Sequence, residues 1–147
     1  MARKRIVVAG TFDVLHPGHV HLISEAAKIG DVVVVVARDR NVQRVKGHPA
    51  VVPEAQRRFM VEALKGVTKA VLGSEDTDLL RIIEQLNPDI LLLGPNQQAS
   101  IDDMQRELQH RKLKTKVHRL ESLSKDFPLS STSAILNKVC TTRKSEP

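Results

Sequence analysis

Short apolar runs recur along the chain and predict the strands of a sheet. They occupy residues 5–10, 31–39, 68–73, 88–94 and 115–120. Each is only a few residues long and rich in Val, Ile or Leu, as strands are. The run at residues 31–39 is apolar at almost every position, which is typical of a parallel strand buried on both faces.

Between these runs, the apolar positions change to the spacing of a helix. This spacing predicts helices over residues 17–30, 53–66, 78–86, 100–113 and 131–139, and a short helix followed by a loop over residues 40–53. The side chains expected to face the core from the helices of residues 17–30 and 53–66 are Val20, Ile23, Ala27, Phe59, Val61 and Leu64, with Leu22 and Ala26 as further candidates.

Regular alternation of strands and helices predicts an α/β protein. We expect a Rossmann-like open parallel sheet of about five strands, with helices on both faces, and a single domain over residues 1–147. Ligands of such sheets bind beyond the carboxyl ends of the strands. Polar or glycine-rich residues collect at four of these ends, which are residues 10–12, 38–39, 73–74 and 94–96.

Composition and charge narrow the function. Hydrophobic residues make up 41% of the chain and charged residues 27%, an ordinary globular balance. A single cysteine excludes an intramolecular disulfide, and no apolar run approaches the length of a membrane helix, so we expect a soluble cytoplasmic protein. The net charge of +6 suits a polyanionic partner, but aromatic residues are only 2%, which disfavours single-stranded nucleic acid.

The stretch GTFDVLHPGHVHLI follows the first predicted strand and carries the most distinctive chemistry. Gly10 permits a sharp turn there, while Pro17 and Gly18 open a helix whose first amides have no internal partner. His16 and His19 are three residues apart and flank that helix start. Free amides, a helix dipole and two imidazoles predict a phosphate site. A zinc site that also uses the third histidine of the stretch, His21, is the less favoured alternative, because no cysteine or acidic cluster accompanies it.

The same stretch resembles the nucleotidyltransferase superfamily that contains the cytidylyltransferases, whose mark is His-x-Gly-His after Gly-Thr-Phe-Asp. Within that superfamily the chain is most similar to archaeal-type FAD synthase, an FMN adenylyltransferase. The likeness continues through VARD, KGHPAVVPEAQRRFMVEALKGV, KAVLGS and NPDILLLGPNQ, and it spans about two-thirds of the chain. The resemblance implies transfer of AMP from ATP to a phosphate-bearing acceptor, with Mg²⁺ as cofactor and release of pyrophosphate.

The resemblance also implies roles for particular residues. His16, His19 and Lys46 would be catalytic, with both histidines also holding the triphosphate. The remaining residues expected to bind the nucleotide are Gly10, Thr11, Phe12, Pro17, Gly18, Arg57, Asn96, Ser131 and Thr132, with Arg58 as a possible helper. The chain lacks the arginine that cytidylyltransferases carry a few residues before the C-terminal hydroxyls, a place that Arg119 or Lys125 could fill.

The acceptor is the least determined part of the hypothesis. A flavin ring packs against aromatic side chains, and the chain has only Phe12, Phe59 and Phe127. Two other acceptors therefore stay open beside FMN: glycerol 3-phosphate, with CTP as the nucleotide, and phosphopantetheine. An alternative of a different class is a non-catalytic module that binds a nucleotide or RNA. Relatives are often dimers, so a homodimer acting on small molecules, without a nucleic acid or membrane partner, is expected by resemblance.

Overall fold

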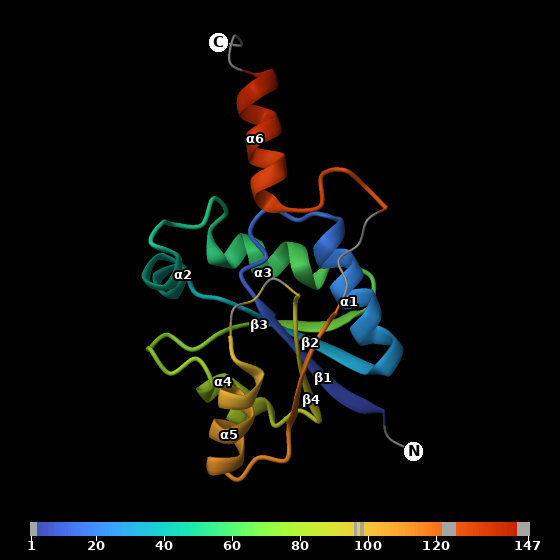
Figure 1. Ribbon diagram of the computed structural model, residues 1–147, viewed down its shortest axis with the longest axis vertical. Helices are drawn as coiled ribbons and strands as arrows, with labels where there is room; N and C mark the ends of the chain where they lie inside the picture. Colours follow the sequence, from blue (N-terminus) through green and yellow to red (C-terminus); the bar gives the residue numbers. More distant parts are fainter. Residues whose placement is uncertain (1–2, 96, 98, 122–125, 144–147) are drawn as a thin grey trace.

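A five-stranded parallel sheet forms the centre of the computed structural model, which describes residues 3–95, 97, 99–121 and 126–143 (Figure 1). Its strands are β1 (Lys4–Gly10), β2 (Gly30–Val36), β3 (Val67–Leu72), β4 (Ile90–Leu93) and β5 (Lys116–Arg119). They lie in the order β3-β2-β1-β4-β5. Val8 of β1 pairs with Val34 on one side and Leu92 on the other. The five predicted strands and the open parallel sheet are thus confirmed.

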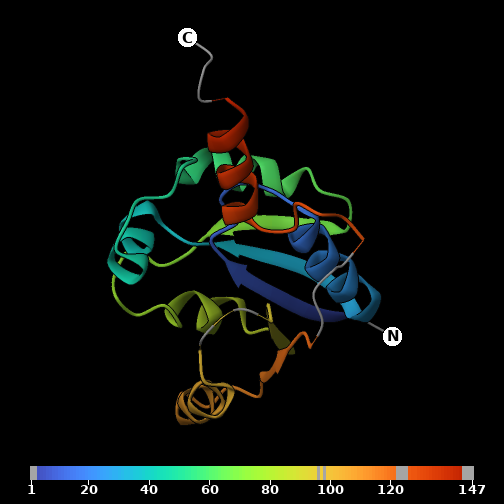
Figure 2. The ribbon, with the colours of Figure 1, turned by 45° about the horizontal axis from the view of Figure 1, so that its top comes forward.

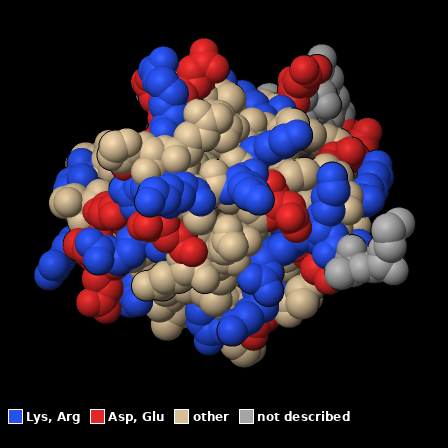
Figure 3. Space-filling view, turned by 90° about the horizontal axis from the view of Figure 1, so that it is seen from below, with Lys and Arg blue, Asp and Glu red and all other residues tan. Residues whose placement is uncertain are grey.

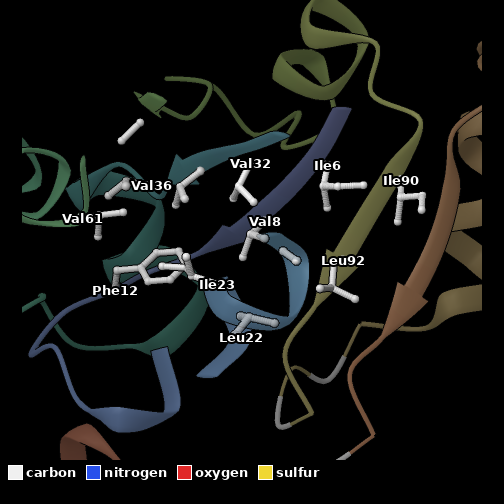
Figure 4. Close-up of a cluster of buried hydrophobic side chains, with 13 residues drawn as sticks. Ile6, Val8, Phe12, Leu22, Ile23, Val32, Val36, Val61, Ile90 and Leu92 are labelled. Atoms are coloured by element: carbon white, nitrogen blue, oxygen red, sulfur yellow. The ribbon is translucent and has the colours of Figure 1, made fainter. Parts of the chain in front are cut away.

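Helices cover both faces of the sheet, as predicted (Figure 2). They are α1 (Pro17–Ile29), α2 (Asp39–Lys46), α3 (Glu54–Glu62), α4 (Arg81–Leu86), α5 (Ile101–His110) and α6 (Thr132–Thr142). Side chains of α1 and α3 pack on one face of the sheet and form the cluster drawn in Figure 4. Side chains of α4 and α5, such as Ile83 and Leu108, form a second cluster on the other face.

Two residues expected in the core lie at the surface instead. Val20 is 48% exposed and Phe59 is 67% exposed. α1 buries Leu22, Ile23 and Ala26, a stripe that leaves Val20 on its outer side. α3 buries Arg57 and Val61, and because successive residues turn by about 100° around a helix, Phe59 points the opposite way. An arginine therefore takes the core position that the sequence pattern assigned to an aromatic ring.

The C-terminal helix α6 extends away from the sheet (Figure 1). It has no buried residue, and its first turn is tied to the rest of the chain. Ser131 caps it by accepting a hydrogen bond from Ala134 N (3.1 Å), and Thr132 Oγ1 donates to the carbonyl of Val14 (3.2 Å). None of the helices in the described part of the chain is long and apolar enough to span a membrane.

The guanidinium group of Arg57 joins the carboxyl ends of β1 and β2 from inside the protein. Its side chain is fully buried, Nη1 donates to the carbonyls of Thr11 and Ala37 (both 2.8 Å), and Nε donates to Val52 (2.7 Å). Nη2 forms an ion pair with Asp39 at 2.6 Å. Four bonds from one rigid, planar group fix the relative positions of three loops.

Replacing Arg57 with Ala should lower the free energy of unfolding by about 3 kcal/mol, because three partly buried carbonyl groups and a partly buried carboxylate lose their donor. Urea unfolding followed by circular dichroism measures this change. Arg58→Ala is the matched control, since Arg58 is 38% exposed and only faces Glu62 at 3.6 Å. We expect that control to stay within about 0.5 kcal/mol of the unmodified chain. Equal effects of the two substitutions would contradict the buried role of Arg57.

Candidate active site

The candidate site lies at the carboxyl ends of β1 and β4, where the strand order reverses. Ligands of open parallel sheets bind in the crevice at such a reversal. The side chain of Gln97 bridges the two ends, because its Nε2 donates to the carbonyl of Ala9 (3.1 Å) and its Oε1 accepts from Gly94 N (2.6 Å). The sequence analysis gave Gln97 no role. An amide at a strand end is the only signal that pointed to it.

The turn after β1 folds one of its side chains inward. Phe12 has a positive φ of 52° and is only 3% exposed, and its ring points into the cluster of Figure 4. A Cβ atom on residue 10 would lie 3.0 Å from this ring, so Gly10 is needed for the close approach. The carbonyl of Thr11 is taken by Arg57. Phe12 is therefore a core residue, and its ring packs beneath the turn that follows β1.

His16 and His19 cap the start of α1 with their own imidazoles. Gly18 N donates to Nδ1 of His16 (3.0 Å), and His16 N donates to Nδ1 of His19 (3.3 Å). A nitrogen that accepts a hydrogen bond in this way carries no proton, so the proton of each neutral ring is on Nε2. The two rings are stacked, with centroids 3.8 Å apart. The pair therefore presents two N–H donors of fixed tautomer.

Burial keeps both imidazoles neutral. It lowers the pKa of His16, and it lowers the pKa of His19 to about 3, with the nearby His16 and Lys46 adding to the effect and Asp13 opposing it. Neutral imidazoles donate hydrogen bonds to phosphate oxygens without adding charge. The negative charge of a triphosphate would raise both pKa values.

The expected phosphate site on the free backbone amides of α1 is corrected by the structure. Pro17 has no N–H group, Gly18 N is bonded to the His16 imidazole, and the amides of His19 and Val20 both point to the His16 carbonyl. Gly18 also has another purpose than expected. A Cβ there would lie 2.8 Å from His16 Cε1 and 3.1 Å from the carbonyl oxygen of Ser130. The glycine thus makes room for the imidazole and for the segment before α6.

Lys46 is the last residue of α2, within the stretch of residues 40–53 where the sequence predicted a short helix and then a loop, with Lys46 in the loop. Gly47 ends this helix in a left-handed conformation with φ of 77°. The charge of Lys46 lowers the pKa of His19, so the cation acts on that imidazole although the lysine is exposed.

Asp13 fastens the loop between α2 and α3, a role that the sequence analysis missed. Its carboxylate oxygens accept hydrogen bonds from Val51 N and Val52 N, both at 2.8 Å. Arg57 Nε also donates to the carbonyl of Val52, so the loop is fixed by hydrogen bonds from both Asp13 and Arg57. The only signal in the sequence was an acidic residue inside the Gly-Thr-Phe-Asp turn.

The other expected cations are placed differently from Lys46. Arg57 is buried, and its bonds to Asp39 and three carbonyls leave it no access to a phosphate, so its expected role as a nucleotide ligand is corrected to a structural one. Arg58 faces Glu62, and Arg119 donates to the carbonyl of Ala99. Asn96 and Lys125 lie outside the described residues.

The start of α6 is brought beside the imidazole pair. Thr132 is bonded to Val14, and Ser130 lies against Gly18, so residues from opposite ends of the chain meet here. The Ser131 hydroxyl is used as the cap of α6. The C-terminal hydroxyls are therefore next to the candidate phosphate site, as expected. Two of them, those of Ser131 and Thr132, form hydrogen bonds with the backbone.

Comparison with known proteins agrees with this geometry. The sequence model of the cytidylyltransferase-like family matches residues 7–137. The chain belongs to the cytidylyltransferase-like family. An FAD synthase of Methanosarcina mazei is 46% identical over 92% of this chain and 87% of its own length. An FAD synthase of Archaeoglobus fulgidus is 46% identical over 90% of this chain and 95% of its own length.

Solved structures show the same fold for this cytidylyltransferase-like chain. A lipopolysaccharide core biosynthesis protein of Thermoplasma volcanium superposes with a TM-score of 0.77 at 34% identity, over 82% of this chain and 98% of its own. A pantothenate synthetase of Thermus thermophilus has a TM-score of 0.64 at 16% identity, over 97% of this chain and 64% of its own, which shows the fold alone. The predicted superfamily and the resemblance to archaeal FAD synthases are confirmed.

The zinc alternative finds no support. Within residues 3–95, 97, 99–121 and 126–143, no group of three His, Cys, Asp or Glu side chains is arranged to hold a metal ion. Nδ1 of His16 and Nδ1 of His19 are already occupied by backbone amides.

The low pKa of His19 makes stability depend on pH. Because the folded pKa of about 3 lies below the unfolded value of about 6.5, the unfolded chain binds more protons between these limits. Proton uptake by the unfolded chain therefore lowers the free energy of unfolding as the pH falls below about 6.5. Above that pH, His19 is neutral in both states and this loss of stability is absent. We expect His19→Gln to reduce the fall in the free energy of unfolding between pH 6.5 and pH 5 by about 1.5 kcal/mol. Urea unfolding at both pH values measures it, and an unchanged pH dependence would contradict a neutral His19.

Proposed function

We propose that this chain transfers AMP from ATP to FMN, giving FAD and pyrophosphate. The observation that supports it most directly is the stacked imidazole pair, which presents two Nε2–H donors beside Lys46 at the mouth of the sheet. The similar FAD synthases match over most of both chains, which supports FMN and ATP as the substrates. We propose the cytoplasm as the place of reaction.

In the proposed reaction an oxygen of the FMN phosphate attacks the α-phosphorus of ATP. The new P–O bond forms as the bond from the α-phosphorus to the bridging oxygen breaks, and that electron pair leaves with pyrophosphate. The FMN phosphate is already deprotonated near neutral pH, so no general base is required. His16 and His19 donate hydrogen bonds to the phosphate oxygens and keep their protons, while Lys46 offsets the charge.

A divalent cation such as Mg²⁺ fits this proposal as a partner of ATP. The carboxylate of Asp13, whose charge acts on His19, already accepts two backbone hydrogen bonds, so the metal would be held by phosphate oxygens and water. When bound it neutralises the charge of the triphosphate. We further propose that the backbone of residues 10–12, together with Asn96, Ser131 and Thr132, contacts the nucleotide.

Small-molecule substrates are preferred to nucleic acid in this proposal. On the face drawn in Figure 3, Lys and Arg side chains are interspersed with Asp and Glu, so that face offers no continuous basic track for a nucleic-acid backbone. Glycerol 3-phosphate with CTP, and phosphopantetheine with ATP, are alternative substrate pairs of the same reaction class.

Pyrophosphate release tests the proposal. We expect turnover with FMN, ATP and Mg²⁺, and none with glycerol 3-phosphate and CTP. His19→Ala should lower kcat by about 100-fold or more, because one positioned donor to the developing charge is lost. His110→Ala is the control, since His110 is an exposed residue at the end of α5. Turnover with glycerol 3-phosphate and CTP alone would show that FMN is not the acceptor. Full activity of His19→Ala would refute the role of His19 as a hydrogen-bond donor to the phosphate oxygens.

We also propose that the chain forms a homodimer through α1 and the end of α3. An open groove of about 330 Å³ lies between α1 and the residues that follow α3. It is lined mainly by apolar groups, which include the exposed Val20 and the partly buried Ala27 and Leu64. An exposed apolar surface is typical of an interaction site. Light scattering after size-exclusion chromatography should give twice the monomer mass of 16.3 kDa, and Val20→Asp should give the monomer. A monomeric unmodified chain would contradict the proposal.

A further inference from the structure

The structure reduces the choice of an aromatic partner for a flavin ring to a single phenylalanine. The chain has three Phe and neither Trp nor Tyr. Phe12 is buried in the core, with its ring centroid 5.1 Å from that of His19. Phe59 is exposed, but it points away from the sheet on the side of α3 opposite Arg57. Phe127, at 62% exposed, is the remaining one.

Phe127 belongs to the turn that precedes α6, and this turn contacts the histidine motif through Ser130. Its carbonyl accepts a hydrogen bond from Ser130 Oγ at 2.6 Å, which closes a tight turn just before α6. The carbonyl of Ser130 in turn lies against Gly18, within the histidine motif. Figures 1 and 2 both show this segment passing over the beginning of α1. The turn is therefore anchored to the site while the Phe127 ring faces solvent.

A second apolar side chain extends this surface. Leu129, two residues after Phe127, is 37% exposed. Two apolar side chains at the surface of a short turn, beside a strongly polar site, have no role in the core of this protein. A flat heteroaromatic ring system gains most from such neighbours, since packing against an aromatic face stabilises it beyond the burial of apolar area alone.

We propose that Phe127, with Leu129 beside it, is the surface on which the ring system of the acceptor packs while the acceptor phosphate faces His16 and His19. This inference rests on the proposed function, because it assumes an acceptor that carries both a phosphate and a large aromatic ring system. It makes Phe127 a specificity residue. Phosphate contacts alone do not distinguish FMN from a small phosphorylated alcohol, whereas an aromatic surface does.

Steady-state kinetics with FMN and ATP test the inference. We expect Phe127→Ala to raise the KM for FMN by about tenfold and to leave kcat and the KM for ATP within about twofold. Phe127→Tyr keeps an aromatic face and should restore the KM for FMN. Phe59→Ala removes an equally exposed phenylalanine away from the site and should change neither constant.

The outcomes separate this inference from the proposed function. If the unmodified chain turns over FMN but Phe127→Ala leaves the KM for FMN unchanged, Phe127 is not the acceptor surface and the proposed function stands. If Phe127→Ala raises the KM for ATP instead, the ring belongs to the adenine site and the inference is overturned. If the unmodified chain releases no pyrophosphate with FMN and ATP, the proposed function fails, and the inference fails with it.

Discussion

One buried guanidinium group, that of Arg57, ties together the loops at the carboxyl ends of the strands. Arg57 binds the carbonyls that follow β1 and β2 and the carbonyl of Val52, and it pairs with Asp39 at the start of α2. Asp39 also exchanges hydrogen bonds with Glu54, so the beginnings of α2 and α3 are tied to each other. Parallel strands place their carboxyl ends side by side, but they do not fix the loops that leave them. In this protein that task falls to Arg57.

The imidazole pair joins the stability of the fold to the chemistry of the site. Each Nδ1 atom satisfies a backbone N–H group that the first turn of a helix leaves unpaired. The same bonds decide which nitrogen carries the proton and which way each Nε2–H points. Desolvation lowers the pKa of both rings and keeps them uncharged. Under the proposed function, the two residues that cap α1 are therefore also the two that bind the anion.

Sequence patterns predicted the sheet well because strands such as residues 32–36 are apolar throughout, and only a sheet covered on both faces buries them. The histidine motif was also readable, since its residue types have little use in a core. The burial of Arg57 was not, because arginine is rarely buried and three of its four partners, Thr11, Ala37 and Asp39, lie 18 to 46 positions away along the chain. The sequence also did not show that His16 occupies the first amides of α1, because residue types alone do not show how a side chain is oriented. The inward turn of Phe12 and the outward turn of Phe59 were hidden for the same reason.

The bond between Thr132 and Val14 spans 118 positions of the chain. The surroundings of the histidine motif therefore depend on a segment that is remote from it in the sequence. A substitution that loosens the segment before α6 would alter the neighbours of the two imidazoles without touching any of the five strands.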